Sequence, residues 1–80
     1  MPDLKTVLIA DDDAFIREDI ADLLSDFGCE LLQTATARET FDIASTRSPH
    51  VILLDLRFPD CRDLSLLKRL RASSPASEII

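Results

Sequence analysis

Acidic side chains directly follow two apolar runs of the sequence, at Asp11–Asp13 and at Asp55. Carboxylate oxygens are the ligands that hard divalent cations prefer, and a carboxylate beside such a cation can attack phosphorus as a nucleophile. Because Asp55 stands alone after its run, it is the better candidate for the nucleophile. Asp11 and Asp12 are the predicted metal-holding pair.

The runs before these acids have the composition of buried strands. Segments 5–10 and 50–55 are nearly continuous apolar stretches, whereas a half-exposed strand alternates polar and apolar residues. A weaker strand is predicted for 30–35, and 77–80 has the pattern of the start of a fourth strand. If the first strand lies between the second and the third, the carboxyl ends of strands one and three are neighbours.

Such a strand order would bring Asp11, Asp12 and Asp55 into one small pocket. Like charges this close remain ionised together only if a positive group joins them. We therefore predict a divalent cation, and Mg2+ fits because it needs few carboxylates and keeps several waters. An aspartate after a strand is also a common cap or turn residue, and this reading suits Asp13 and Asp63.

The first helix is predicted over residues 14–27. Asp13 is placed to cap its first backbone N–H groups, and Gly28 follows where a helix end favours a left-handed residue. The apolar residues of this helix recur at helical spacing and define one face: Ile16, Ile20, Leu23, Leu24 and Phe27.

Two further helices are predicted. Thr36 caps the second, which runs to about Thr46, and Glu39 stands where a capping box requires an acid. Asp63 is a candidate cap for the third, which ends before Pro75. Core packing is expected for the leucines of the third helix and for the apolar face of the second: Leu64, Leu67 and Leu70, and Ala37, Phe41 and Ala44.

Strands and helices therefore alternate as β-α-β-α-β-α, followed by the start of another strand. Strands separated by helices are joined by right-handed crossovers and form a parallel sheet. The predicted fold class is α/β, a doubly wound parallel sheet. It is predicted to be incomplete, since the sequence stops as a fourth strand begins.

Composition excludes several classes of protein. The 80 residues carry nine Lys and Arg against fifteen Asp and Glu, a net charge of −6. Nucleic-acid binding needs a basic surface, so cations or a basic protein are the expected partners. A hydrophobic fraction of 46% argues against disorder, and no apolar run approaches the roughly 20 residues of a membrane helix.

We expect a cytoplasmic chain without a signal peptide, with Cys29 buried, Cys61 exposed and no disulfide.

Two segments together resemble the receiver domain of two-component response regulators: Val7–Asp13 followed by Arg17, and His50–Pro59. The acidic run after the first strand, the lone aspartate after the third and a proline four residues later make the combination specific. The resemblance implies a flavodoxin-like (CheY-like) fold that begins with the strand order 2-1-3. Residues 1–80 would form the N-terminal two thirds of such a domain.

The resemblance also implies a phosphorelay function, in which Asp55 accepts a phosphoryl group from a sensor histidine kinase or a phosphotransfer protein. It implies Mg2+ as cofactor, with Asp12 and Asp55 as ligands, Asp11 acting through a water, and the backbone carbonyl of Arg57 completing the set. On this reading the chain is a signalling phosphoprotein and not an enzyme. His50 lies about 16 Å from Asp55, at ~3.3 Å per strand residue, so a structural role is expected for it.

Departures from the family pattern leave alternatives open. Asp63 stands where the family has a glycine, and the family's hydroxyl residue and lysine after strands 4 and 5 fall beyond Ile80. A receiver-like interaction module that works without phosphorylation is the main alternative. A phosphatase of the haloacid dehalogenase type is another, with Asp11 and Asp13 as its acid pair. If the domain ends at Ile80, we expect slow phosphorylation, because the lysine and hydroxyl contacts that the resemblance implies would be missing. We also expect a homo-oligomer, because part of the first helix would be exposed, as would strand 3 unless the few residues of a fourth strand cover it.

Overall fold

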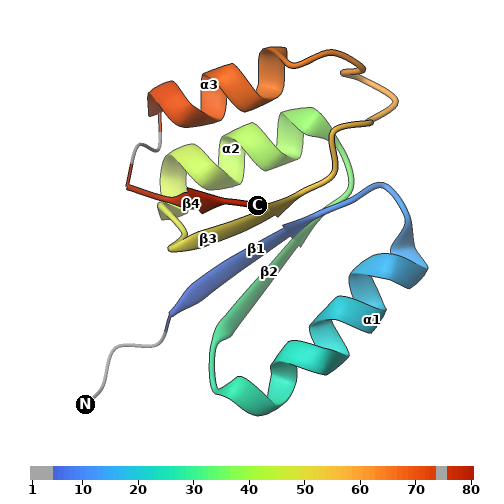
Figure 1. Ribbon diagram of the computed structural model, residues 1–80, viewed down its shortest axis with the longest axis vertical. Coiled ribbons are helices and arrows are strands. Elements are labelled where there is room, and N and C mark those ends of the chain that lie inside the picture. The colour runs from blue at the N-terminus through green and yellow to red at the C-terminus, as the bar shows by residue number, and fades with distance from the viewer. Residues whose placement is uncertain (1–4, 74–75) are drawn as a thin grey trace.

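The computed structural model describes residues 5–73 and 76–80, which form a four-stranded parallel sheet with helices on both faces (Figure 1). The strand order is β2-β1-β3-β4, as the predicted fold requires. The strands are β1 (Thr6–Ala10), β2 (Glu30–Thr34), β3 (Val51–Leu54) and β4 (Glu78–Ile79). The helices are α1 (Ala14–Leu24), the 3-10 turn η1 (Ser25–Phe27), α2 (Ala37–Arg47) and α3 (Ser65–Ser73).

The two faces of the sheet are covered unequally. The helices α2 and α3 lie side by side on one face, and α1 lies on the other (Figure 1). The buried core lies under α2 and α3. Residues of β1, of β3 and of the segment after β3 meet both helices there: Leu8, Ala10, Ile52 and Phe58 with Ala37, Ala44, Leu66 and Leu70. On the opposite face, none of the residues Ala14–Leu24 of α1 is fully buried. Most of the packing energy therefore comes from the α2 and α3 side.

Part of the apolar face of α1 and η1 is in solvent. Leu23 is 72% exposed, Phe27 is 75% exposed and Ile16 is 43% exposed. This agrees with the expectation that part of the predicted apolar set would lack a neighbour. The expectation of an exposed edge at β3 is wrong, because β4 pairs with β3 through Val51 and Ile52.

The end of the first helical segment differs from the prediction of a continuous α-helix over 14–27. Ser25 donates both its backbone N–H and its hydroxyl to the carbonyl of Asp22, a spacing of three residues that tightens the last turn into a 3-10 helix. Gly28 then takes the left-handed conformation, with φ +67°, that the sequence predicts at this end.

The predicted helix caps form. Asp13 accepts hydrogen bonds from the backbone N–H groups in the first turn of α1. Thr36 Oγ1 accepts the N–H of Glu39 at 3.1 Å at the start of α2. The Glu39 carboxylate reaches back to the N–H of Ala35, one residue before the position that a regular capping box would use.

The helix α3 faces the core through other leucines than predicted. It begins at Ser65, so Leu64 precedes it and is 50% exposed, and Leu67 is half-buried. Leu66 and Leu70 are buried instead. Because residues four apart share one face of a helix, these two define the buried stripe. The prediction was right for Leu70 and wrong for Leu64.

A polar pair lies inside the core between β2 and α2. Thr40 is fully buried, and its hydroxyl is 2.7 Å from the hydroxyl of the buried Thr34 and donates to the carbonyl of Thr36. Each buried hydroxyl is therefore bonded, which removes the cost of burying it. Both cysteines are free thiols, as predicted, but Cys29 and Cys61 are each half-buried rather than buried and exposed. Within the described residues, no helix is long and apolar enough to cross a membrane.

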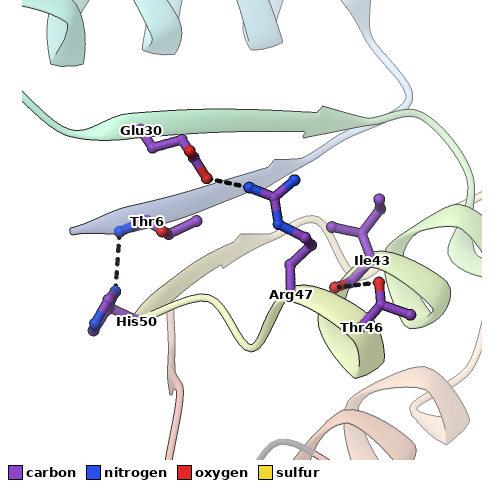
Figure 2. Close-up of polar contacts among 6 residues, drawn as sticks. All are labelled: Thr6, Glu30, Ile43, Thr46, Arg47 and His50. Atoms are coloured by element: carbon purple, nitrogen blue, oxygen red, sulfur yellow. Dashed lines mark hydrogen bonds and ion pairs between the residues drawn. The ribbon is translucent and has the colours of Figure 1, made fainter. Parts of the chain in front are cut away.

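The amino ends of the strands are joined by polar contacts (Figure 2). The Nδ1 atom of His50 accepts the backbone N–H of Thr6 at 3.0 Å. Arg47, the last residue of α2, forms an ion pair with Glu30, the first residue of β2. His50 therefore has the structural role that the sequence predicts, at the end of β3 opposite to Asp55.

Phe58, after β3, is 1% exposed and among the largest buried side chains. Phe58→Ala should lower the free energy of unfolding by about 3–5 kcal/mol, because truncating a buried aromatic loses apolar burial and leaves a cavity. Leu56→Ala is the control; this residue is 49% exposed, and its loss should cost less than about 1 kcal/mol. Urea denaturation followed by circular dichroism measures both. Equal losses would show that Phe58 does not anchor this segment.

Candidate functional site

The carboxylates of Asp11, Asp12 and Asp55 come together at the carboxyl edge of the sheet. The strands β1 and β3 are parallel with Ala10 opposite Leu54, so the next residue of each chain segment is an aspartate at the same level. One oxygen from each of the three carboxylates lies within 4.8 Å of the others. The convergence that the sequence predicts is therefore present.

The backbone of two of these acids is bonded into the sheet. The N–H of Asp55 donates to the carbonyl of Ala10 at 2.9 Å, and the N–H of Asp11 donates to the carbonyl of Thr34 at 3.1 Å. Both bonds continue the ladder one residue past the strands. A cavity of about 240 Å3 lies beside the two acids on the α1 side and has a mainly apolar lining: Ile9, Ala10, Ile20, Leu53, Leu54 and Ile80. Asp11 and Asp55 are accordingly half-buried.

Each half-buried carboxylate is held by a backbone N–H two residues further along. Asp11 Oδ1 accepts the N–H of Asp13 at 2.9 Å, and Asp55 Oδ1 accepts the N–H of Arg57 at 3.0 Å. This arrangement is an Asx turn, in which an aspartate side chain mimics a backbone turn. The turns therefore fix one oxygen of each carboxylate.

Arg17 supplies a positive charge next to the cluster. Its Nη1 donates to the backbone carbonyl of Asp11 at 2.7 Å, and its side chain is half-buried. Arg17 enters the sequence prediction only through the resemblance, and no contact is predicted for it. A local signal existed, because Arg17 lies four residues after Asp13 and so one turn into the helix that Asp13 caps.

Burial raises the pKa of Asp11, and repulsion from Asp55, Asp12 and Asp13 adds to the rise, while the hydrogen bond from the Asp13 N–H opposes it. A raised carboxyl pKa means that the folded chain holds this proton more tightly than the unfolded chain. Ionised Asp11 therefore costs stability at pH values above its folded pKa, and protonation removes that cost as the pH falls. A cation between the carboxylates would remove the same cost near neutral pH.

A second cavity, of about 310 Å3, opens beside Asp12. Its other lining residues are Arg57, Phe58, Pro59 and Arg62. Within residues 5–73 and 76–80, neither of these two guanidinium groups pairs with a carboxylate. The acidic cluster thus borders a space with two positive charges, of which only Arg57 is among the predicted site residues.

Two other predicted acids lie outside the cluster as caps. Asp13 binds the first turn of α1, so it does not support the acid pair of the phosphatase alternative. Asp63 Oδ1 accepts the N–H of Ser65 at 2.9 Å, at the start of α3. Among the described residues, Ser48 is the non-glycine residue with positive φ, so Asp63 does not need the left-handed backbone that would favour glycine.

The response regulator receiver domain model matches residues 7–80. The chain belongs to this family. It is 39% identical over 67 residues to the phosphate regulon transcriptional regulatory protein PhoB of Pseudomonas aeruginosa, covering 84% of this chain and 29% of that protein. It is 30% identical over 77 residues to the chemotaxis protein CheY of Thermotoga maritima, covering 95% of this chain and 64% of that protein.

A solved receiver domain (CheY-like) of Methanospirillum hungatei has a similar fold, with a TM-score of 0.91 and 28% identity, over 96% of this chain and 62% of that one. The family and the flavodoxin-like strand order are thereby confirmed. The chain spans less than two thirds of the length of each of these three relatives. The roles of Asp55 as phosphoacceptor and of the Arg57 carbonyl as metal ligand stay predictions, as does the assignment of residues 1–80 to two thirds of a receiver domain.

Asp12→Asn should weaken Mn2+ binding at this edge, because a neutral amide replaces a charged oxygen ligand. A loss of about tenfold or more is expected, since changes further from a metal already cost that much. Paramagnetic line broadening in NMR spectra during a Mn2+ titration measures the affinity. Asp13→Asn is the control and should keep it, because asparagine also caps helices. Broadening that centres elsewhere, or that is unchanged in Asp12→Asn, would refute the site.

Proposed function

We propose that this receiver domain accepts a phosphoryl group on Asp55 from a sensor histidine kinase or a phosphotransfer protein. The observation that carries the proposal is the group of three carboxylates with oxygens within 4.8 Å of one another, in which Asp55 lies across from Asp11 at the ends of two paired strands. Phosphoryl acceptance is typical of the family to which the chain belongs. On this proposal the chain is an acceptor in the cytoplasm and not an enzyme.

The donor set at this edge fits Mg2+. It consists of hard carboxylate oxygens close to one another, and Mg2+ needs few protein ligands because it keeps several waters. In the proposal Asp12 and Asp55 ligate the ion directly, Asp11 acts through a bound water, and the backbone carbonyl of Arg57 completes the protein ligands. When bound, Mg2+ would neutralise charge on the transferred phosphoryl group.

In the proposed transfer, a carboxylate oxygen of Asp55 attacks phosphorus while the bond from phosphorus to the donor's imidazole nitrogen breaks. That nitrogen keeps the bonding electron pair, and the ring, protonated on its other nitrogen, leaves as neutral imidazole. Asp55 becomes an acyl phosphate. The Arg57 N–H holds Asp55 Oδ1 at 3.0 Å, which orients Oδ2 for the attack. The guanidinium groups of Arg57 and Arg62 supply positive charge at the adjoining cavity, where an anionic donor would enter.

Asp55→Asn should abolish phosphoryl uptake from acetyl phosphate in the presence of Mg2+, because an amide nitrogen or oxygen does not replace the carboxylate nucleophile. Intact-mass measurement after incubation detects the added phosphoryl group. Asp42→Asn, an exposed acid on α2, is the control and should be labelled like the parent chain. Labelling that persists in Asp55→Asn would assign another acceptor, and an unlabelled parent chain would favour the interaction-only alternative.

We also expect the 80-residue chain to associate with a second copy of itself. Leu23 and Phe27 project from α1 and η1 with 72% and 75% of their surface exposed, and burying such side chains against another molecule is favourable. Sedimentation velocity at micromolar concentrations measures the association. The double variant Leu23→Ser with Phe27→Ser should weaken it, whereas Leu64→Ser, on the other side of the sheet, should not. A parent chain that sediments as a monomer would contradict this expectation.

A further inference from the structure

The segment between β3 and α3 is tied to α2 by one carboxylate. Asp60 Oδ1 accepts the N–H of Ala37 at 2.8 Å, and Asp60 Oδ2 accepts the N–H of Arg38 at 3.1 Å. These donors are the first two residues of α2, 23 and 22 residues away in the sequence. With Thr36 bonded to the N–H of Glu39, each of the first three N–H groups of α2 has a side-chain acceptor. Two of these three acceptor oxygens belong to Asp60, which lies in the segment between β3 and α3.

The contact is electrostatically favourable. The first N–H groups of a helix are free of intrahelical partners and carry the positive end of the helix dipole, so a carboxylate there is stabilised. The hydrogen bond from Ala37 holds the pKa of Asp60 below its usual value, and the bond from Arg38 adds to this effect. Asp60 is therefore a charged acceptor at neutral pH.

Residues 57–61 connect Asp60 to the acidic site, and hydrogen bonds restrict the backbone of this short stretch. Phe58 is 1% exposed, and Phe58 and Cys61 exchange two backbone hydrogen bonds of 3.1 Å, which close the turn that carries Asp60. Arg57 directly precedes this closed turn. Its N–H is the group that donates to Asp55 Oδ1 at 3.0 Å. The position of the turn thus determines where the Arg57 N–H lies relative to Asp55.

We propose that Asp60 is a positioning residue for the acidic site: by bonding the turn to the start of α2, it holds the Arg57 N–H where that group orients Asp55. This inference rests on the proposed function, because it concerns metal binding and phosphoryl acceptance at the same site. The same link would make the start of α2 respond to cation binding at Asp55. On this proposal, cation binding at the cluster would move the Arg57 N–H with Asp55, and the closed turn would pass that movement through Asp60 to the N–H groups of Ala37 and Arg38.

The first test compares Asp60→Ala with Asp63→Ala. Both acids lie in the same exposed segment and accept backbone N–H groups. The Asp63 carboxylate accepts the N–H of Ser65 and the thiol of Cys61, whereas only Asp60 bonds to the start of α2. Asp60→Ala should lower the affinity for Mn2+ by about tenfold, as expected when an outer-shell partner is lost. Asp63→Ala should leave the affinity within about twofold. Asp60→Asn keeps one good acceptor oxygen and should lose less than Asp60→Ala.

The second test uses the unmodified chain. Titration with Mg2+ should shift the amide NMR signals of Ala37 and Arg38, and in folded Asp60→Ala these shifts should disappear. A merely structural role would lower the free energy of unfolding and leave Mn2+ affinity and the shifts unchanged, which would overturn the inference. If Asp60→Ala does not fold, Asp60→Asn and the shifts in the unmodified chain decide. If Asp12→Asn weakens Mn2+ binding and Asp60→Ala does not, the inference fails while the proposed metal site stands.

Discussion

The parallel register that sets Ala10 beside Leu54 is the constraint on which the acidic site depends. It brings Asp11 and Asp55 to the same level of the sheet edge, and their N–H groups extend the ladder by one bond each. The two acids therefore cannot separate without breaking sheet hydrogen bonds. Burial and mutual repulsion raise the pKa of Asp11 as a result. The fold holds together charges that would otherwise move apart, and this is the arrangement that a divalent cation relieves.

The groups that orient the carboxylates are mostly backbone donors. The N–H groups of Asp13 and Arg57 each hold one carboxylate oxygen, so the side chains at these positions can vary without loss of the contact. Arg17 acts on the backbone of Asp11 from the first turns of α1. Three parts of the chain therefore contact the acids of the site: the segment after β1, the helix α1 and the segment after β3. Asp60 links them to a fourth, the start of α2, which has no contact of its own with the three acids among the bonds described.

Local patterns predicted most of the elements, and tertiary packing explains the exceptions. The apolar runs before Asp11 and Asp55 became neighbouring strands, and the cap at Asp13 formed as predicted. The prediction that Leu64 belongs to the buried face of the third helix was wrong, because α3 begins only at Ser65. The spacing of the leucines in the sequence does not show at which residue the helix begins. The apolar residues of α1 were predicted from their helical spacing. How much of their surface is covered depends on which elements lie next to α1 in the fold.

The fold class, the acids of the cluster and the strands that carry them could be predicted from the residue pattern. These follow from periodicity and from chemistry that is encoded within a few residues, such as an aspartate after a buried run. Which distant groups meet depends on the packing of the assembled elements. The bond from Ala37 to Asp60 and the buried pair of Thr34 with Thr40 join residues whose local patterns give no sign of a partner. Such contacts depend on how α2 packs against the sheet and the segment after β3, because a hydrogen bond needs a distance and an angle that only the assembled elements supply.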